Sequence, residues 1–324
     1  YIEGIGLLLD EGVAIVGGCC GTTPEYIEGI KQLISNREII KRDKIELSAI
    51  CSPSKVVNID SVKVIGERIN PTGKKLFKEA LREGNLDYIL KQGISQVDAG
   101  ADILDVNVGL PEINEKDWMR RVVTNLQGIL DTPLQIDSTN VEAVEVGLRY
   151  YNGKPILNSV NGEEESLNKI LPLVKKYGAS VVALTLDNNG IPKTAEERFK
   201  IAERILNKAL EYGIKKEDVF IDTLVLPISS DQESAKVTLS ALRLVKDRLG
   251  LNTVLGVSNI SFGLPRRELI NKNFLALALE EGLTLPIINP NIEGMMETIN
   301  SFRLLYNHDK DGKHFIEVYG DIKE

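Results

Sequence analysis

The stretch ADILDVNVGLPEINEKDWMRRVVTNLQGILDTPLQIDSTN, residues 101–140, contains one complete repeating unit of the fold. An apolar run at 101–109 ends in polar residues, residues 117–130 carry apolar side chains at helical spacing, and a second apolar run follows at 133–138. A strand, a helix and a strand in this order predict a parallel βαβ unit with a right-handed crossover. The polar residues that follow each strand are then expected at one edge of the sheet.

The same rhythm extends from Val62 to the end of the chain. The strand candidates are residues 62–70, 101–109, 133–138, 155–160, 180–187, 219–227, 253–263 and 285–290, and amphipathic helices are expected at 86–100, 117–130, 141–151, 165–178 and 196–213. Eight such units over about 250 residues are the size of a (β/α)8 TIM barrel. An open doubly wound sheet is the alternative, but no GxGxxG follows the first strand and no P-loop lysine motif occurs.

Composition narrows the class of protein. The chain has 324 residues, of which 43% are hydrophobic and 27% charged, and a net charge of −8 with a pI near 5.2. An acidic chain is a poor nucleic-acid binder, and no apolar run reaches the roughly 18 residues of a membrane span. No basic, then apolar, secretory signal opens the sequence, and three cysteines cannot form a disulfide framework. We therefore expect a cytoplasmic enzyme with no nucleic-acid or membrane partner.

In a barrel of this kind the chemistry belongs to the residues at the carboxyl ends of the strands. These residues are Glu67, Arg68, Asn70, Asp105, Asn107, Asp137, Ser138, Asn158, Asp187, Asn188, Asp222, Ser258, Asn259 and Asn289. The only histidines, His308 and His314, lie beyond the last predicted strand. A histidine-based metal centre in the barrel and a Ser-His-Asp triad are therefore excluded.

Carboxylates and amides that face a cavity suit a ligand with N–H donors and ring nitrogens, such as the edge of a pterin. Some of these residues have simpler explanations. Ser138, Asn140 and Asn188 can cap the helices that follow them. Asp105 can hold a neighbouring loop through an arginine, and Glu67 with Arg68 can form an internal ion pair.

Five motifs carry a resemblance to a known family. GERINPTGKK (66–75), DVNVG (105–109), QIDSTN (135–140), LNSVNGE (157–163) and GVSNISFGLPRR (256–267) resemble the methyltetrahydrofolate-binding barrel of cobalamin-dependent methionine synthases and of the related corrinoid methyltransferases of acetogens. The resemblance covers Val62 to Phe315 and implies a pterin-binding barrel like that of dihydropteroate synthase. That last family itself is ranked lower, because its INVTPDSF-like start and closing Ser-Arg-Lys element are missing.

The resemblance also implies roles for the strand-end residues. The family binds 5-methyltetrahydrofolate and donates its N5 methyl group to Co(I) cobalamin; no DxHxxG motif occurs, so a cobalamin-binding domain elsewhere would be the partner. Asp137, Asn158 and Asp222 would hold the pyrimidine edge, and Asn259 would support protonation of N5. The further substrate-binding residues are expected to be Glu67, Asn70, Asp105, Asn107, Ser258 and Asn289, together with Arg267, which reaches the benzoyl-glutamate tail or forms a surface ion pair.

The segment GGCCGTTPEYI, residues 17–27, resembles the last strand and helix of the zinc-dependent homocysteine-binding barrel that precedes the folate barrel in methionine synthases. Cys19 and Cys20 would then be zinc ligands in an intact parent, whose third thiolate comes from an earlier strand. Two thiolates alone make a poor tetrahedral site, and two loop cysteines without a role are the alternative. Cys51 is expected to be a structural thiol.

These observations give a plan of the whole chain. Residues 1–45 are expected to be the C-terminal remnant of a second, homocysteine-binding barrel, 46–61 a linker that includes one candidate strand, 62–315 the pterin-binding barrel and 316–324 a tail. The helix-like start at Tyr1 suggests a piece of a longer protein. The leading hypothesis is a methyltransferase module of methionine synthesis. The alternatives are a methyltetrahydrofolate:corrinoid protein methyltransferase, a non-catalytic folate-binding module and a barrel that is inactive without its other domains.

Overall fold

The computed structural model describes residues 1–35, 37–38, 40 and 46–320. Residues 1–46 and 47–324 form two separate compact units, which are described in turn.

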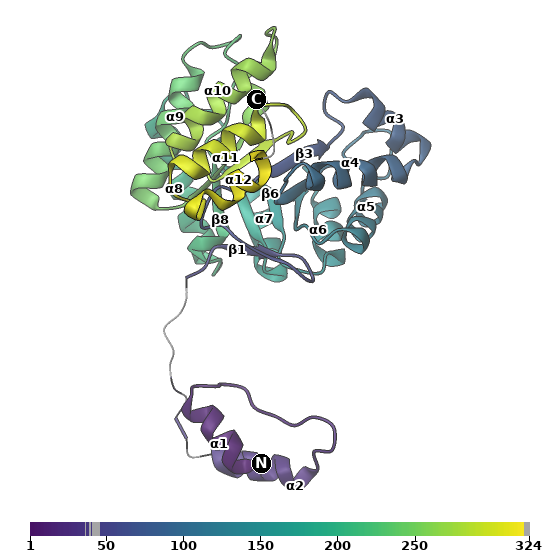
Figure 1. The fold of residues 1–324 in the computed structure, drawn as a ribbon, viewed down its shortest axis with the longest axis vertical. Coiled ribbons are helices and arrows are strands. Elements are labelled where there is room, and N and C mark those ends of the chain that lie inside the picture. The colour runs from purple at the N-terminus through teal and green to yellow at the C-terminus, as the bar shows by residue number, and fades with distance from the viewer. Residues whose placement is uncertain (36, 39, 41–45, 321–324) are drawn as a thin grey trace. The chain divides into compact units, whose positions relative to one another are not determined.

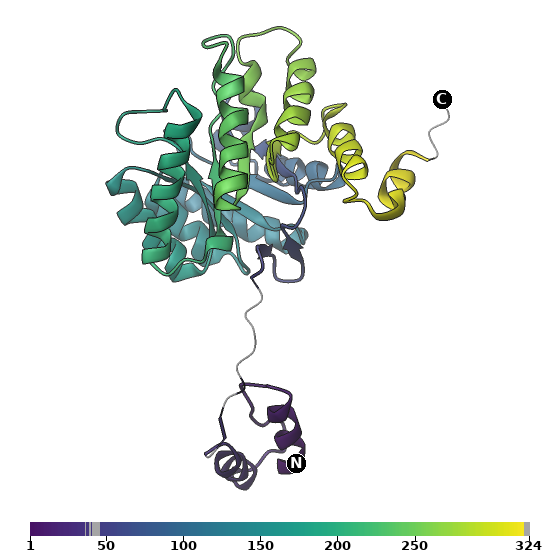
Figure 2. The same ribbon diagram turned by 90° about the vertical axis from the view of Figure 1, so that its left-hand side faces the viewer.

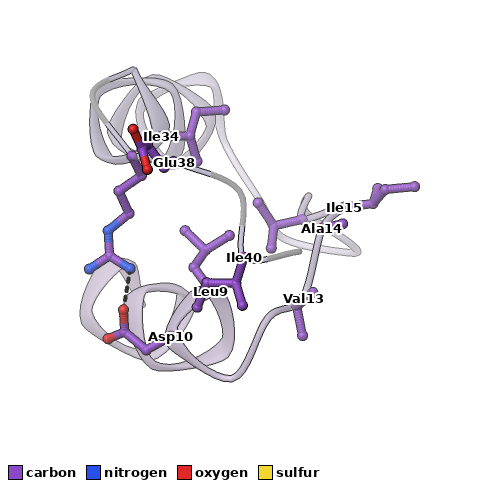
Figure 3. A pocket seen from close by; sticks show the side chains of 10 residues that line it. Leu9, Asp10, Val13, Ala14, Ile15, Ile34, Glu38 and Ile40 are labelled. Atoms are coloured by element: carbon purple, nitrogen blue, oxygen red, sulfur yellow. Dashed lines mark hydrogen bonds and ion pairs between the residues drawn. The ribbon is translucent and has the colours of Figure 1, made fainter. Parts of the chain in front are cut away.

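The first unit contains two helices, α1 (Ile2–Asp10) and α2 (Pro24–Ile34). Pro24 occupies the first turn of α2, because its fixed φ and missing N–H suit that position. Arg37 fastens the segment after α2 to α1, since its Nη1 donates to the carbonyl oxygen of Gly6 at 3.1 Å and pairs with Asp10 at 2.7 Å. Figure 3 shows the hollow of about 610 Å³ beside this ion pair, lined by apolar side chains from both helices and the segment between them.

The second unit is a closed barrel of eight parallel strands. The strands are β3 (Ile65–Ile69), β4 (Ile103–Val106), β5 (Leu134–Asp137), β6 (Ile156–Asn161), β7 (Ser180–Leu184), β8 (Val219–Asp222), β9 (Asn252–Gly256) and β10 (Leu285–Ile288). Each strand pairs with the next along the chain, and β10 pairs with both β9 and β3, which closes the barrel. The predicted TIM barrel is confirmed, and the open sheet is wrong.

Helices surround the strands, as Figures 1 and 2 show. They are α3 (Lys75–Glu83), α4 (Leu86–Asp98), α5 (Glu115–Ile129), α6 (Val141–Tyr150), α7 (Glu164–Tyr177), α8 (Ala195–Glu211), α9 (Ser234–Leu244), α10 (Arg267–Glu280) and α11 (Met295–Leu305). Helix α5 illustrates why they form: Asn114 caps it by accepting the Asp117 amide, and acidic residues occupy its first turn. Its buried apolar face includes Trp118, Met119 and Leu126.

The interior of the barrel begins with an apolar layer. Its residues belong to one cluster, which includes Ile65, Ile103, Ile156, Val182, Phe220, Val254 and Leu285. These residues come from seven of the eight strands, and their side chains point inward. Because side chains alternate along a strand, the residue two positions later on each strand also points inward, one layer nearer the carboxyl ends.

Residues 47–61, most of the stretch expected as a linker, belong to the second unit. Strands β1 (Ala49–Cys51) and β2 (Val56–Asn58) form an antiparallel hairpin, and Ile50 and Val57 of this hairpin are buried in the apolar cluster of the barrel interior. Figure 1 shows the hairpin across one end of the barrel. Cys51 forms an isolated antiparallel β-bridge with Lys154, and the Lys154 amide nitrogen lies 3.3 Å from the Cys51 sulfur. The expectation missed the hairpin because only three residues form each strand.

The C-terminal segment lies on the outside of the barrel, as the yellow ribbon in Figures 1 and 2 shows. A short helix, α12 (Lys313–Tyr319), follows α11 and covers the boundary between the expected barrel and the expected tail at 316–324. Residues 321–324 of that tail lie outside the described residues. Within the described ranges, no helix combines the length and the apolar character that crossing a bilayer requires.

Candidate functional site

A polar layer lies directly above the apolar layer of the barrel. Counting two residues onward from the apolar layer reaches Glu67 on β3, Asp105 on β4, Asn158 on β6 and Asp222 on β8. On β5 the inward-facing residues are Gln135 and Asp137. The predicted carboxylates and amides therefore meet at one mouth of the barrel, although they are far apart in the sequence.

Asn107, Asp137 and Asn158 form a continuous arc across three neighbouring strands. The Asn107 Nδ2 donates to Asp137 Oδ2 at 3.0 Å, and Asp137 stands opposite Asn158 in the β5–β6 register. The Asn158 side chain has no hydrogen bond within the described part of the chain, so its donor and its acceptor are both available to a ligand. Burial raises the pKa of Asp137 to about 6, and the charge of Glu115 adds to the rise.

Asp222 lies at the same mouth of the barrel, as the last residue of β8. Its Oδ1 accepts the amide of Leu224 at 2.7 Å, which fixes the rotation of the carboxylate. Burial raises the pKa of Asp222 to about 7, although the Leu224 amide and the Arg198 charge act in the opposite direction. A carboxylate that has lost its water shell gains most from N–H donors supplied by a ligand.

Asp105 lies deeper than the other carboxylates. Gln135 Nε2 donates to its Oδ1 at 2.7 Å. No arginine pairs with Asp105 among the described residues, so the alternative of an arginine partner is wrong there. Burial raises the pKa of Asp105 well above its ordinary value, and the nearby Asp137 adds to the rise. Burial and the neighbouring Asp137 charge therefore both disfavour the ionised form of Asp105.

Glu67 lies between Lys74 and Ser258. Lys74 Nζ donates to the backbone oxygen of Glu67 at 2.9 Å, and Ser258 Oγ donates to both carboxylate oxygens at 3.2 and 3.3 Å. Burial raises the pKa of Glu67 and lowers that of Lys74, while each group counteracts the shift of the other. Within the described residues Glu67 forms no ion pair with Arg68, so that alternative is wrong.

Asn259 lies on the short helix η3 (Val257–Ser261), which follows β9 directly. A Cβ at Gly256 would lie only 3.0 Å from Asn259 Nδ2, so the amide occupies the space that a side chain on the mouth-facing Gly256 would fill. Arg267 holds η3 in place: its Nη2 donates to the Ser258 backbone oxygen at 2.9 Å and its Nε to Ser261 Oγ at 3.0 Å. Its guanidinium also lies 4.6 Å from the centroid of the Phe262 ring.

Other strand-end residues shape the loops around the mouth. Asn140 caps α6 by accepting two amides, so the capping explanation is confirmed for this residue. Ser138 does not cap the helix; its Oγ accepts the amide of Asn140 in the turn before α6. Asn70 Oδ1 accepts the Thr72 amide, and Asn289 Oδ1 accepts the Asn291 amide. A hollow of about 600 Å³ opens beside Asn107 and is lined by Thr72, Ser138 and Asn140 among others.

Three residues of this region were missed by the sequence reasoning. Gln135 breaks an otherwise apolar inward-facing layer, and the strict alternation in PLQIDS was the signal for it. Lys74 stands in the motif GERINPTGKK, next to residues that were singled out. Arg198 occupies the first turn of an amphipathic helix, where a charge normally faces water, so no local signal could have found it.

Comparison with known proteins identifies the family. Residues 66–289 match the family model described as pterin binding enzyme. The chain belongs to the pterin-binding enzyme family. The matched range begins on β3 and ends just after β10, so it includes nearly all of the eight strands and their polar mouth. Residues 2–34 of the first unit match a second model, homocysteine S-methyltransferase.

Relatives within and around the pterin-binding family differ in length. A methionine synthase from Mycobacterium tuberculosis is 34% identical over 303 residues, which are 88% of this chain and 25% of that protein. The chain thus spans about a quarter of the length of this relative. A methylcorrinoid:tetrahydrofolate methyltransferase from Eubacterium limosum is 31% identical over 76% of this chain and 92% of its own length. A solved dihydropteroate synthase from Xanthomonas albilineans shares the fold, with a TM-score of 0.64 at 17% identity over 80% of this chain and 98% of its own.

The two adjacent cysteines of the first unit are exposed free thiols, with Cys19 Sγ 3.9 Å from Cys20 Sγ. The described ranges contain no group of three or more His, Cys, Asp or Glu side chains arranged to hold a metal. Because a structural zinc ion needs four ligands, these two thiolates alone do not form a zinc site.

Proposed function

We propose that the barrel binds 5-methyltetrahydrofolate by its pterin ring and transfers the N5 methyl group to a Co(I) corrinoid, as one step of methionine synthesis. The observation that carries the proposal is the arc of Asn107, Asp137 and Asn158 facing Asp222, inside a barrel that is similar to a tetrahydrofolate methyltransferase over 92% of that protein's length. The corrinoid acts as the methyl acceptor and is carried by another domain or protein.

The pterin ring fits the polarity of this mouth. Its pyrimidine edge presents adjacent N–H donors, and a carboxylate accepts two such bonds in parallel. Asp222 and Asp137 are carboxylates whose pKa is raised by partial burial, and Asn158 adds one donor and one acceptor for a mixed edge. Glu67 and Asn107 lie beside them, with Asn70, Asp105, Ser258 and Asn289 in the supporting loops and layers.

The leaving group determines what the remaining residues must do. A tertiary amine leaves poorly, so N5 must gain a proton or a strong hydrogen bond during the transfer. The Asn259 amide can support that proton but cannot supply it. Water, or a network that includes an aspartate, must deliver it, and Asp105 is the candidate aspartate because burial raises its pKa and it lies one layer below the ligand. Arg267 would act by holding the helix that carries Asn259, and a contact with the folate tail remains a secondary role.

Methionine synthesis is favoured over the other corrinoid reactions by the first unit. The similarity to methionine synthases covers 88% of this chain, and residues 2–34 match the homocysteine S-methyltransferase model. In a protein that supplies a third thiolate, Cys19 and Cys20 would hold zinc for homocysteine. The free thiols of the chain suit a cytoplasmic location.

The direct test is a titration followed by a turnover assay. Purified protein is expected to bind 5-methyltetrahydrofolate at one site per chain by calorimetry, and to release tetrahydrofolate, measured by chromatography, when free Co(I) cobalamin is added without oxygen. Binding without release of tetrahydrofolate would favour the non-catalytic folate-binding module. Absence of both would contradict the proposed function.

A further inference from the structure

Arg198 is a buried cation at the back of the mouth. It lies in the first turn of α8, only 1% of its surface is exposed, and it forms no ion pair within the described ranges. Its Nη1 donates to the backbone oxygens of Thr223 at 2.7 Å and Leu224 at 2.8 Å, and lies 3.2 Å from Thr238 Oγ1. Its Nε donates to the backbone oxygen of Pro192 at 3.0 Å. A buried guanidinium that donates its hydrogen bonds almost entirely to backbone carbonyl oxygens holds that backbone in one conformation.

The backbone that Arg198 fixes is the turn that orients Asp222. Leu224 has a φ of 64°, in the left-handed region that a branched side chain rarely adopts. Its amide donates to Asp222 Oδ1 at 2.7 Å, while its carbonyl oxygen accepts from Arg198 and, at 2.8 Å, from Thr238 Oγ1. One residue thus connects the buried arginine on one side with the carboxylate on the other.

We propose that Arg198 is a positioning residue: by holding the carbonyl oxygens of Thr223 and Leu224, it fixes the turn that aims the Asp222 carboxylate into the mouth. The ligand part of this inference, that Asp222 is aimed at a pterin edge, rests on the proposed function. The geometric part concerns the protein alone and can be tested without ligand.

The charges of Arg198 and Asp222 also affect each other. The Arg198 charge lowers the pKa of Asp222 against the larger effect of burial, and the Leu224 amide acts in the same direction as Arg198. Asp231, in the loop before α9, is the other carboxylate whose charge acts on Arg198. Removing the guanidinium should therefore misplace Asp222 and raise its pKa further, whereas a lysine should keep the charge and lose the multiple contacts.

The test compares Arg198→Met, Arg198→Lys and the control Arg204→Met. Arg204 is on the same helix and also donates to a carbonyl oxygen, that of Gly162 at 2.9 Å, but contacts no part of the Asp222 turn. The pKa of Asp222 in the ligand-free protein is followed by carbon-13 NMR of the carboxyl group, assigned with Asp222→Asn. The Kd for 5-methyltetrahydrofolate is measured by calorimetry, and folding is checked by thermal melting.

We expect Arg198→Met to raise the pKa of Asp222 by about half to one pH unit and the Kd by about 10- to 100-fold. Arg198→Lys should raise the Kd at least about fivefold while the pKa stays near that of the wild type. Arg204→Met should change neither. If Arg198→Met does not fold, Thr238→Val, which removes one donor to the Leu224 oxygen, should still raise the Kd.

The inference is overturned if folded Arg198 variants keep the wild-type pKa of Asp222 and the wild-type Kd, or if Arg204→Met changes both as much. The two proposals fail separately. A wild-type protein that binds no folate would contradict the proposed function, while the titration of Asp222 would still decide the role of Arg198.

Discussion

Asp222→Asn is expected to weaken the binding of 5-methyltetrahydrofolate by about 100-fold or more at pH 8, measured as Kd by calorimetry. The substitution keeps the shape of the side chain and the oxygen that accepts the Leu224 amide at 2.7 Å. It replaces the other oxygen by an N–H₂ group, which faces the N–H donors of the pterin edge. Loss of a charge-assisted hydrogen bond and an unpaired donor together cost about 3 kcal/mol, or a factor of about 100.

The same variant should be more stable than the wild type in the absence of ligand. The pKa of Asp222 is about 7 in the folded protein against an ordinary 3.8, so the folded state holds a proton between these values that the unfolded state has lost. The wild type therefore loses stability as the pH rises from about 4 to 7, and above pH 7 it buries an unfavourable charge. Removing that charge should stabilise the protein by about 1–4 kcal/mol at pH 8, seen as a higher melting temperature.

Asp187→Asn is the matched control, because Asp187 also follows a barrel strand. Its carboxylate pairs with Arg204 at 2.9 Å at the rim, and the Asn189 amide and Arg204 lower its pKa. This variant should bind folate within about twofold of the wild type and should gain no stability. Equal folate affinity for Asp222→Asn and the wild type would show that the pterin does not use this carboxylate.

Asn259→Ala is expected to lower the rate of methyl transfer to free Co(I) cobalamin by about 100- to 1,000-fold while the Kd for 5-methyltetrahydrofolate changes less than about threefold. The amide side chain is exposed on η3 and has no hydrogen bond within the described part of the chain, so its loss should leave the barrel intact. The substitution should therefore remove a hydrogen bond to N5 that forms mainly in the transition state of methyl transfer.

Single-turnover measurement of tetrahydrofolate release separates the two quantities. Asn188→Ala, an exposed asparagine in the loop after β7, is the control and should transfer at the wild-type rate. If Asn259→Ala lost affinity and rate in equal proportion, the amide would be a ground-state contact to the ligand. If it lost neither, Asn259 would have no part in the reaction.

The barrel could be predicted from the sequence because each unit repeats the same local signals. Strands such as ADILDV and SVVALTL are short and rich in apolar residues, as expected for strands buried on both faces, and the helices carry clear apolar stripes and caps. The hairpin at 49–58 could not be predicted this way, because its strands are short and Ile50 is buried by the barrel interior, far along the chain.

The residues of the candidate site could also be predicted only where topology alone places them. Strand-end carboxylates such as Asp137 and Asp222 could be named because topology alone brings them to one mouth. Partners that depend on tertiary contacts could not. Gln135 donates to Asp105 from the neighbouring strand β5, and the sequence shows that Gln135 faces inward but not which side chain it contacts. Arg198 reaches the Asp222 turn from helix α8, and this contact leaves no pattern in the local sequence.

The central claim is that the carboxylates at the mouth must be ionised to bind the pterin. The Kd of the wild type for 5-methyltetrahydrofolate, measured by calorimetry from pH 5 to pH 8.5, tests it most directly. The raised pKa values of about 7 for Asp222 and about 6 for Asp137 mean that the free site holds protons at low pH, which binding must release. The Kd is predicted to rise by about tenfold per pH unit below pH 7, more steeply below pH 6, with the first phase absent in Asp222→Asn. A Kd that stays constant over this range, or falls toward low pH, would contradict the account.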